Sequence, residues 1–278
     1  MKTEKQNIWG IDYNFQQRQN KVKSSASTKI IIVSYMFNKQ STEITKLAVD
    51  SIKKFTKEDY EILISDNNSP KENFQWVVDD KEISYIRNLD AKNYKKLNDS
   101  FLNALGIEAG LRNIEQHTTN VVLMHSDVVV AHRNWLPFIK NKINDQVKGV
   151  GLLIDNTRIN AMHISGTIFS YDIYSKYKAD VRPNLPYIDV GDDITQKIRD
   201  NNFKYEFCRN SHNDEEVIDC ISPDSIFKNM HSDRAIDDEN NVIFAHLGRG
   251  RAKSDKTYSK ANRTTADQWI SKIKEFLI

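Results

Sequence analysis

The sequence has little cysteine: only Cys208 and Cys220 occur in 278 residues. Two cysteines are too few for a disulfide framework, and their separation does not have the spacing of a zinc site. We therefore expect two free thiols in a reducing compartment, with one disulfide between them as the alternative.

Long apolar runs are also missing from the sequence. None approaches the roughly 18 residues that span a bilayer, and the first residues lack the apolar core of a secretory signal. The expected location is the cytoplasm, with peripheral contact at the inner membrane surface as an alternative. The formal net charge is only +2, which gives no electrostatic reason to expect a nucleic-acid partner.

The sequence does contain β-branched runs that alternate with helical spacing. Strands are predicted at residues 29–35, 60–65, 83–87 and 121–124, and helices at about 41–55 and 99–116. A strand, a helix and a strand with short joints form a unit with a right-handed crossover and parallel strands. This alternation of strands and helices over about the first 130 residues predicts an α/β fold with a doubly wound, mostly parallel sheet.

Polar residues follow three of these strands. Ser34 ends the first, Asp66 the second, and His125, Ser126 and Asp127 follow the apolar run at 121–124. The carboxyl ends of parallel strands meet at one edge of a sheet, where such folds bind their ligands. We therefore expect these side chains to line one crevice.

The order and spacing of these motifs resemble family 2 glycosyltransferases of the GT-A fold. The resemblance covers about residues 29–250 and is carried by four segments, residues 33–38, 62–69, 88–103 and 122–127. It implies a smaller mixed sheet on the acceptor side of the main sheet. The expected organisation is a polar, loosely packed arm at 1–28, a transferase domain at 29–262 divided near residue 130, and an amphipathic helix at 263–278.

The resemblance implies a nucleotide-diphosphate sugar as donor, with Asp66 against the base. The other residues expected at the donor are Ser34, Tyr35, Asn38, Asn67, Asn98 and Ser126. The alternative for residues 66–70 is a plain turn, because all of these residue types favour turns.

Asp127 is the metal candidate, in the position of the family's Asp-x-Asp motif. Its carboxylate is a suitable ligand for Mn²⁺ or Mg²⁺, but His125 stands where the first Asp is expected. His125 is either a ligand or structural, and the resemblance adds His246 to the metal site. Arg249 and Arg251 are natural phosphate partners, unless they form a solvated basic turn.

An inverting sugar transfer requires a general base. The family has an acidic pair at the start of a helix, and Asp192 and Asp193 match it. We expect Asp193 to be the base, with Asp192 second and Asp189 third. The alternative is that these acids only favour the helix dipole.

Two further segments have open roles. Residues 208–241 are rich in charge and are interpreted as a solvated, flexible acceptor loop rather than a metal cluster. The C-terminal helix is expected to pack on the domain or in a homodimer, with membrane attachment as the alternative. The acceptor is a glycan, a lipid-linked molecule or a protein, as in bacterial-type polysaccharide or glycoconjugate synthesis.

Two other functions remain open. A non-catalytic subunit that binds nucleotide sugars is consistent with the missing first Asp. A nucleotidyltransferase is less consistent, because such enzymes have a glycine-rich phosphate loop and residues 34–40 contain no glycine.

Overall fold

A computed structural model describes residues 2–20, 23–91, 99–248 and 264–278. Its largest element is a nine-stranded sheet with the strand order β1-β2-β5-β4-β3-β6-β11-β8-β12. The bounds of these strands are β1 Lys2–Ile8, β2 Ile11–Arg18, β3 Thr28–Ser34, β4 Glu61–Asp66, β5 Ile83–Asn88, β6 Asn120–His125, β8 Val147–Gly151, β11 Gly166–Ser170 and β12 Lys204–Phe207.

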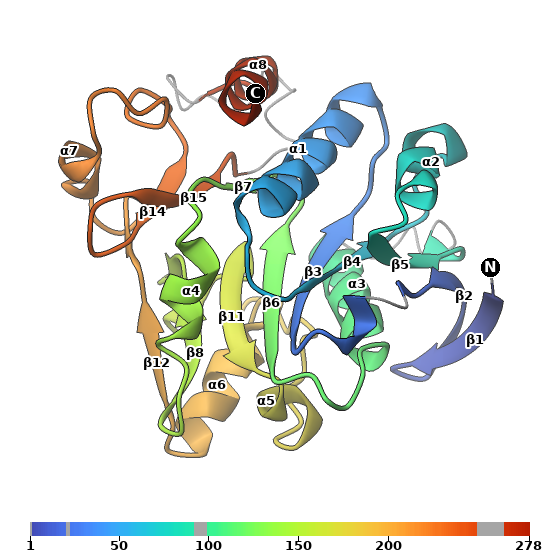
Figure 1. Ribbon diagram of the computed structural model, residues 1–278. Coiled ribbons are helices and arrows are strands. Elements are labelled where there is room, and N and C mark those ends of the chain that lie inside the picture. The colour runs from blue at the N-terminus through green and yellow to red at the C-terminus, as the bar shows by residue number, and fades with distance from the viewer. Residues whose placement is uncertain (1, 21–22, 92–98, 249–263) are drawn as a thin grey trace.

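A smaller, antiparallel sheet lies beside the large one (Figure 1). It contains β13 (Arg209–Asn210), β14 (Asp233–Ile236), β15 (Val242–His246) and β7 (Val128–Val130), in that order. A separate pair joins β9 (Ile154–Asp155) and β10 (Ala161–Met162). The predicted mixed α/β fold, with a large central sheet and a smaller one, is confirmed.

Helices cover both faces of the large sheet. Their bounds are α1 Lys39–Phe55, α2 Lys71–Asp79, α3 Asp99–Arg112, α4 Trp135–Lys140, α5 Asp172–Ser175, α6 Asp192–Asp200, α7 Val217–Cys220 and α8 Ala266–Leu277, with a 3₁₀ turn at Lys23–Ser25. Residues of α1, α2 and α4 pack against one face, and those of α3 and α6 pack against the other. Because β3, β4 and β6 are buried on both faces, their apolar runs are nearly continuous.

The centre of the large sheet is parallel, as predicted. β3 pairs in parallel with β4 and with β6, so that Ser34 lies opposite Asp66 and Val33 lies opposite His125. This register places the carboxyl ends of the three strands at one edge. The alternating residues 163–170 predict an antiparallel strand at the sheet edge. The structure has a shorter strand, β11, which is antiparallel to β6 as expected but lies between β6 and β8 rather than at the edge.

The N-terminal arm differs from the expectation. Residues 2–18 form a β-hairpin, and β2 pairs with β5 at the edge of the large sheet. Tyr13 and Phe15 are buried, because alternate side chains of a strand face the same side. The alternation of polar and apolar residues outweighs the polar composition, and the arm is part of the sheet.

The C-terminal helix packs on the domain. Trp269 and Ile273 are buried in a cluster that includes residues of α1, and Lys274 pairs with Glu43 of α1 at 2.8 Å. Among the described residues, no helix combines the length and apolar character needed to cross a membrane. Cys208 and Cys220 are both free thiols, as expected.

Candidate functional site

The site begins where the chain passes from one sheet to the other. β6 of the large sheet ends at His125, and β7 of the small sheet starts at Val128, so Asp127 lies in the joint between them. β15 returns alongside β7, with His246 opposite Val128. The Leu247 amide donates to the Asp127 carbonyl, 3.0 Å away. Strand pairing therefore brings together two residues that are far apart in the sequence.

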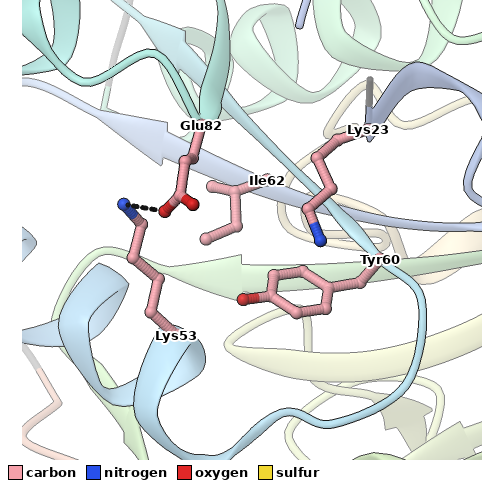
Figure 2. A pocket seen from close by; sticks show the side chains of 5 residues that line it. All are labelled: Lys23, Lys53, Tyr60, Ile62 and Glu82. Atoms are coloured by element: carbon pink, nitrogen blue, oxygen red, sulfur yellow. Dashed lines mark ion pairs between the residues drawn. The ribbon is translucent and has the colours of Figure 1, made fainter.

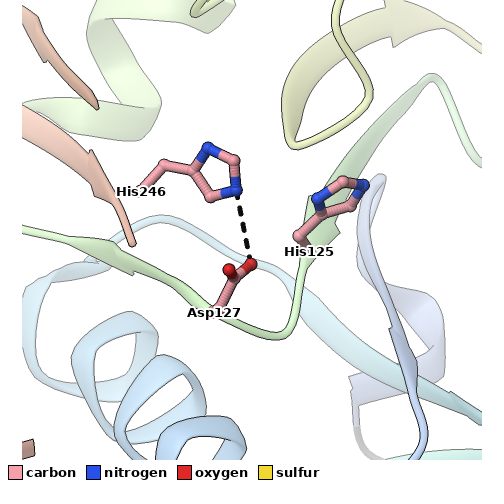
Figure 3. Close-up of side chains that lie close together, drawn as sticks. All are labelled: His125, Asp127 and His246. Atoms are coloured by element: carbon pink, nitrogen blue, oxygen red, sulfur yellow. Dashed lines mark ion pairs between the residues drawn. The ribbon is translucent and has the colours of Figure 1, made fainter. Parts of the chain in front are cut away.

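His125, Asp127 and His246 form a compact group (Figure 3). Each offers one ligand atom, and these atoms all lie within 4.8 Å of one another. His246 Nε2 is 3.4 Å from Asp127 Oδ1. Asp127 and His246 are 9% and 5% exposed, so the group is largely shielded from water while His125 keeps partial access.

His246 lies between two carboxylates. Its Nδ1 is 3.3 Å from Asp233 Oδ2, and the other oxygen of Asp233 is 3.6 Å from His212 Nδ1. Burial favours the neutral ring, but Asp127 and Asp233 outweigh it and raise the pKa of His246 to about 9. Although burial opposes the effect, His212 and His246 hold the pKa of Asp233 far below its ordinary range.

A third imidazole, His163, adjoins this group. Its ring centroid is 5.6 Å from that of His125 and 6.2 Å from that of His246. The Ser165 amide donates to His163 Nδ1 at 3.1 Å, so the neutral ring carries its proton on Nε2. Burial and the other two rings lower the pKa of His163 to about 3. Burial and His246 lower that of His125 to about 4.

The three residues fit a divalent metal ion. Both ring nitrogens of His246 are buried, and neither meets the geometry of a hydrogen bond, although each lies at ion-pair distance from a carboxylate. A cation bound at Nε2 would take the place of a proton between that nitrogen and Asp127. Two imidazoles and one carboxylate are a common set of metal ligands in proteins.

The acidic pair begins α6, as predicted. The Asp192 carboxylate accepts from the Asp189 amide at 2.7 Å, and that of Asp193 accepts from the Asp180 amide at 2.7 Å. Asp192 is 4% exposed. Burial, assisted by Asp155 and Asp189, raises the pKa of Asp192. The two acids therefore have different surroundings, and Asp192 adjoins the carboxylates of Asp155 and Asp189.

Gly191 connects the acidic pair to the histidines. A Cβ built on Gly191 would lie 2.4 Å from Ile164 Cγ2, and Ile164 lies between His163 and Ser165. The Ser165 carbonyl in turn accepts from the His125 amide at 3.2 Å. Segment 163–165 therefore touches the end of β6 on one side and the start of α6 on the other.

Asp66 is at the predicted strand end, but its carboxylate is fully engaged. It accepts from Ser34 Oγ at 3.1 Å, from the Ser69 amide at 2.9 Å and from the Ser69 hydroxyl, and it pairs with Arg87 Nε at 3.3 Å. Asp66 is 1% exposed. Burial raises its pKa, although these partners oppose the shift. Its contact with a nucleobase stays a prediction.

The other predicted donor residues have varied surroundings. Tyr35 is 40% exposed, Asn38 caps α1 by accepting from the Ser41 amide at 2.8 Å, and Asn67 donates to the Leu102 carbonyl at 3.0 Å. Ser126 is partly exposed in the joint beside Asp127. Donor binding by these four residues stays a prediction, and Asn98, Arg249 and Arg251 lie outside the described residues.

A small pocket at the opposite edge of the sheet is separate from this group (Figure 2). Its volume is about 140 Å³, and it is lined by Lys23, Lys53, Tyr60, Ile62 and Glu82. Tyr60 and Glu82 directly precede β4 and β5, so they lie at the amino ends of these strands. Lys53 pairs with Glu82 at 3.0 Å, and Lys23 Nζ lies over the Tyr60 ring, 5.2 Å from its centroid.

Two residues of the site are absent from the sequence predictions. His163 falls in the strand predicted at 163–170, and Asp233 falls in the segment interpreted as a solvated loop. Asp233 is instead in β14, with a side chain that is 14% exposed. The sequence signal that could have identified Asp233 is the repeated occurrence of His near Asp or Glu in residues 208–241. This pattern is the basis of the alternative interpretation of the segment as a metal cluster.

No protein-family model matches this chain, and no curated protein does either. Solved structures similar to it include glycosyltransferases. One is the mannosyltransferase PcManGT from Pyrobaculum calidifontis in complex with GDP-Man and Mn²⁺, with a TM-score of 0.49 and 12% identity. That match covers 66% of this chain and 54% of the mannosyltransferase.

Two other similar structures have lower TM-scores. Glucosyl-3-phosphoglycerate synthase from Mycobacterium tuberculosis, in complex with Mn²⁺ and UDP, has a TM-score of 0.45 and 11% identity over 66% of this chain and 70% of that chain. S. aureus TarS has a TM-score of 0.45 and 13% identity over 65% of this chain and 57% of that chain. These values concern the fold alone, so the function of this chain has to be inferred from its own side chains.

Proposed function

We propose that this protein is an inverting glycosyltransferase that moves a sugar from a nucleotide-diphosphate sugar to an acceptor hydroxyl. One observation supports this most directly. The candidate metal group lies at the carboxyl end of β6, and helix α6 begins with two acidic residues. Both structures contact segment 163–165. Sugar transfer requires these two functions next to each other: charge compensation for a diphosphate and a base for the acceptor.

His125, Asp127 and His246 are the residues that would hold a divalent cation. When bound, the cation offsets the negative charge that develops on the departing nucleoside diphosphate. His163 donates only through Nε2 when neutral, because Nδ1 accepts from the Ser165 amide. A neutral donor next to the trio suits a phosphate oxygen. Arg249 and Arg251 remain further candidates for the diphosphate.

Asp192 is the better candidate for the general base than Asp193. Its raised pKa brings it closer to neutral pH, where a base takes up protons efficiently. Its carboxylate takes the proton of the acceptor hydroxyl while the hydroxyl oxygen bonds to the anomeric carbon. The bond from that carbon to the diphosphate oxygen breaks, and its electron pair leaves with the diphosphate. Attack from the opposite side inverts the configuration.

The proposal extends to the finer features implied by the resemblance to family 2. These are a cytoplasmic location, donor contacts from the β3 and β4 ends, and a glycan, lipid-linked or protein acceptor in bacterial-type polysaccharide or glycoconjugate synthesis. A homodimer is retained as a proposal as well. Peripheral attachment through α8 receives less support, because Trp269 and Ile273 face α1 and the small sheet.

Nucleotide binding is the first test. Titrating the protein calorimetrically with UDP, GDP and dTDP, each with MnCl₂, should give saturable binding of at least one nucleotide. Asp127→Ala should weaken that binding, since it removes the only carboxylate of the trio. If none of the nucleotides binds with or without metal, the proposed donor site is wrong.

Sugar transfer is the second test. With the nucleotide identified, the matching nucleotide sugars are incubated with an acceptor panel, and products are detected by mass spectrometry. Asp192→Asn should abolish transfer and leave nucleotide affinity unchanged, whereas the adjacent Asp193→Asn should retain most activity. Full activity of Asp192→Asn would remove Asp192 from its role, and loss only in Asp193→Asn would return the role to Asp193.

A non-catalytic nucleotide-sugar-binding subunit is the second candidate. It is favoured by His125, which replaces a carboxylate that the related motif uses. It predicts nucleotide-sugar binding without products from any acceptor, and without donor hydrolysis on long incubation. Release of free sugar by the wild-type protein but not by Asp127→Ala would exclude it.

A further inference from the structure

We infer that the trio His125, Asp127 and His246 selects a first-row transition-metal ion over Mg²⁺, and that Asp233 positions His246 for this purpose. The inference rests on the metal-binding part of the proposed function. It does not depend on sugar transfer, because it concerns only the ligand set and the group behind it.

The ligand set is richer in nitrogen than in oxygen. Two of its three ligand atoms are imidazole nitrogens and one is a carboxylate oxygen, all within 4.8 Å of one another. Mg²⁺ requires oxygen ligands in a nearly ideal octahedron, whereas imidazole suits Zn²⁺, Fe²⁺, Ni²⁺ and Cu²⁺. His125 therefore moves the preference of the site away from Mg²⁺.

The state of His246 points independently to a ligand. The residue is 5% exposed, and neither ring nitrogen makes a hydrogen bond although both are buried. Nε2 is the nitrogen on the side of Asp127, at 3.4 Å (Figure 3). A cation at Nε2 would give this buried nitrogen a direct ligand contact beside the Asp127 carboxylate.

Asp233 supports His246 from the other side of the ring. Its Oδ2 is 3.3 Å from His246 Nδ1, and its Oδ1 is 3.6 Å from His212 Nδ1. In metal sites the second ring nitrogen usually donates to a carboxylate, which fixes the orientation and tautomer of the ligand. β14 and β15 pair directly, with Asp233 opposite His246, so the backbone holds the two side chains together.

His163 does not join the ligand set in this arrangement. Its Nδ1 accepts from the Ser165 amide and lies 2.7 Å from Ser165 Oγ. That nitrogen is therefore occupied, and the neutral ring keeps its proton on Nε2. The two imidazole ligands of the trio are therefore those of His125 and His246.

Metal titration without any nucleotide tests the selectivity. Protein stripped with EDTA is titrated calorimetrically with MgCl₂, MnCl₂, CoCl₂ and ZnCl₂. Co²⁺ and Zn²⁺ should bind with one equivalent and at least about tenfold more tightly than Mg²⁺. His125→Asp should reduce the ratio of the Mg²⁺ and Co²⁺ dissociation constants by about tenfold or more.

A matched histidine variant controls for adventitious binding. His132 also adjoins a buried carboxylate, with Nδ1 3.8 Å from Asp237 Oδ2, but lies beyond the far end of β7. His132→Gln should leave every affinity unchanged, whereas His246→Gln should abolish the one-equivalent site. Equal affinity for Mg²⁺ and Co²⁺, or an unchanged ratio in His125→Asp, would overturn the selectivity.

Asp233 is tested by two variants with the same metal readout. Asp233→Asn should weaken Co²⁺ binding by about 10–100-fold, and Asp233→Glu should recover part of the loss. The Co²⁺ absorption spectrum should change in Asp233→Asn, because the orientation of a ligand changes. Unchanged affinity and spectrum in a folded Asp233→Asn protein, checked by circular dichroism, would exclude the positioning role.

The outcomes separate this inference from the proposed function. Selective metal binding without nucleotide binding would support the inference and contradict the transferase. Nucleotide binding and transfer with Mg²⁺ as effective as Co²⁺ would support the transferase and contradict the inference.

Discussion

Gly191 packs directly on Ile164, and no side chain larger than hydrogen fits between them. A Cβ on Gly191 would be 2.4 Å from Ile164 Cγ2, and the φ angle of Gly191 is +76°. The residue is the N-cap of α6, so its conformation determines where Asp192 lies relative to His163 and His125. The close approach of one glycine thus couples the candidate base to the candidate metal group.

Gly191→Ala should destabilise the protein and impair transfer more than donor binding. The positive φ alone costs about 1 kcal/mol for alanine, and the clash with Ile164 adds about 1–3 kcal/mol. Gly10→Ala is the matched control, because Gly10 has a φ of +83° but no atom within 4 Å of its Cβ position. Urea unfolding of both variants measures the difference, and equal losses would show that the contact with Ile164 is unimportant.

Trp269→Ala should lower the free energy of unfolding by about 3–5 kcal/mol. Trp269 of α8 is fully buried against α1 and the small sheet, so truncation of its side chain leaves a large cavity. Glu275→Ala in the same helix is the control, because Glu275 is exposed and should change stability by less than about 0.5 kcal/mol. A small loss in Trp269→Ala would mean that α8 is only loosely attached.

The centre of the fold was predictable from sequence for a simple physical reason. Residues 30–33, 62–64 and 121–124 are apolar runs that have to be buried on both faces, and their polar ends mark one edge of the sheet. Asp192 and Asp193 were equally visible, because acids favour a helix start. The N-terminal hairpin was missed because its polar composition masked the alternation that buries Tyr13 and Phe15.

The inner part of the site was less accessible to sequence reasoning. Asp233 reaches His246 through the pairing of two short strands, β14 and β15, and the four residues of β14 include two charges. Such a segment has the composition of a loop. His163 reaches the site because β11 pairs with β6, and no local pattern distinguishes it from a strand residue. Asp66 was expected at a ligand, but its distant partner Arg87 could not be foreseen.

Titration of the buried histidines should make the metal-free protein most stable near pH 6.5. His163 and His125 have pKa values lowered from 6.5 to about 3 and about 4. Below pH 6.5 the unfolded chain takes up protons that the folded chain does not, so stability falls with acid. The pKa of His246 is raised to about 9, so its contribution is complete below pH 6.5 and is lost as the pH rises towards 9.

Urea unfolding in EDTA between about pH 5 and 9 measures both limbs of this profile, with slopes up to about 1.4 kcal/mol per pH unit for each group. His163→Gln should flatten only the acid limb. His246→Gln should remove the alkaline limb and also weaken the acid limb, because the His246 ring lowers the pKa values of His125 and His163. An alkaline limb that persists unchanged in His246→Gln would contradict the assignment.

Asp66→Asn should destabilise the protein before any nucleotide is added. The buried carboxylate accepts from Ser34 and Ser69 and pairs with Arg87, and an amide cannot replace all of these contacts. Removing one partner of a buried ion pair costs about 3–5 kcal/mol. Ser34→Ala should cost only about 1 kcal/mol, because it removes one hydrogen bond and leaves the carboxylate in place.

Nucleotide affinity in these two variants decides between a structural and a recognition role for Asp66. If the Asp66 carboxylate only stabilises the turn that follows β4, both variants should lose stability. The affinities for nucleotides with different bases should then fall by the same factor. If it contacts a base, Asp66→Asn should change the preference between uracil and guanine nucleotides while Ser34→Ala should not. Calorimetric titration with UDP and GDP, at a temperature where both variants are folded, distinguishes these results.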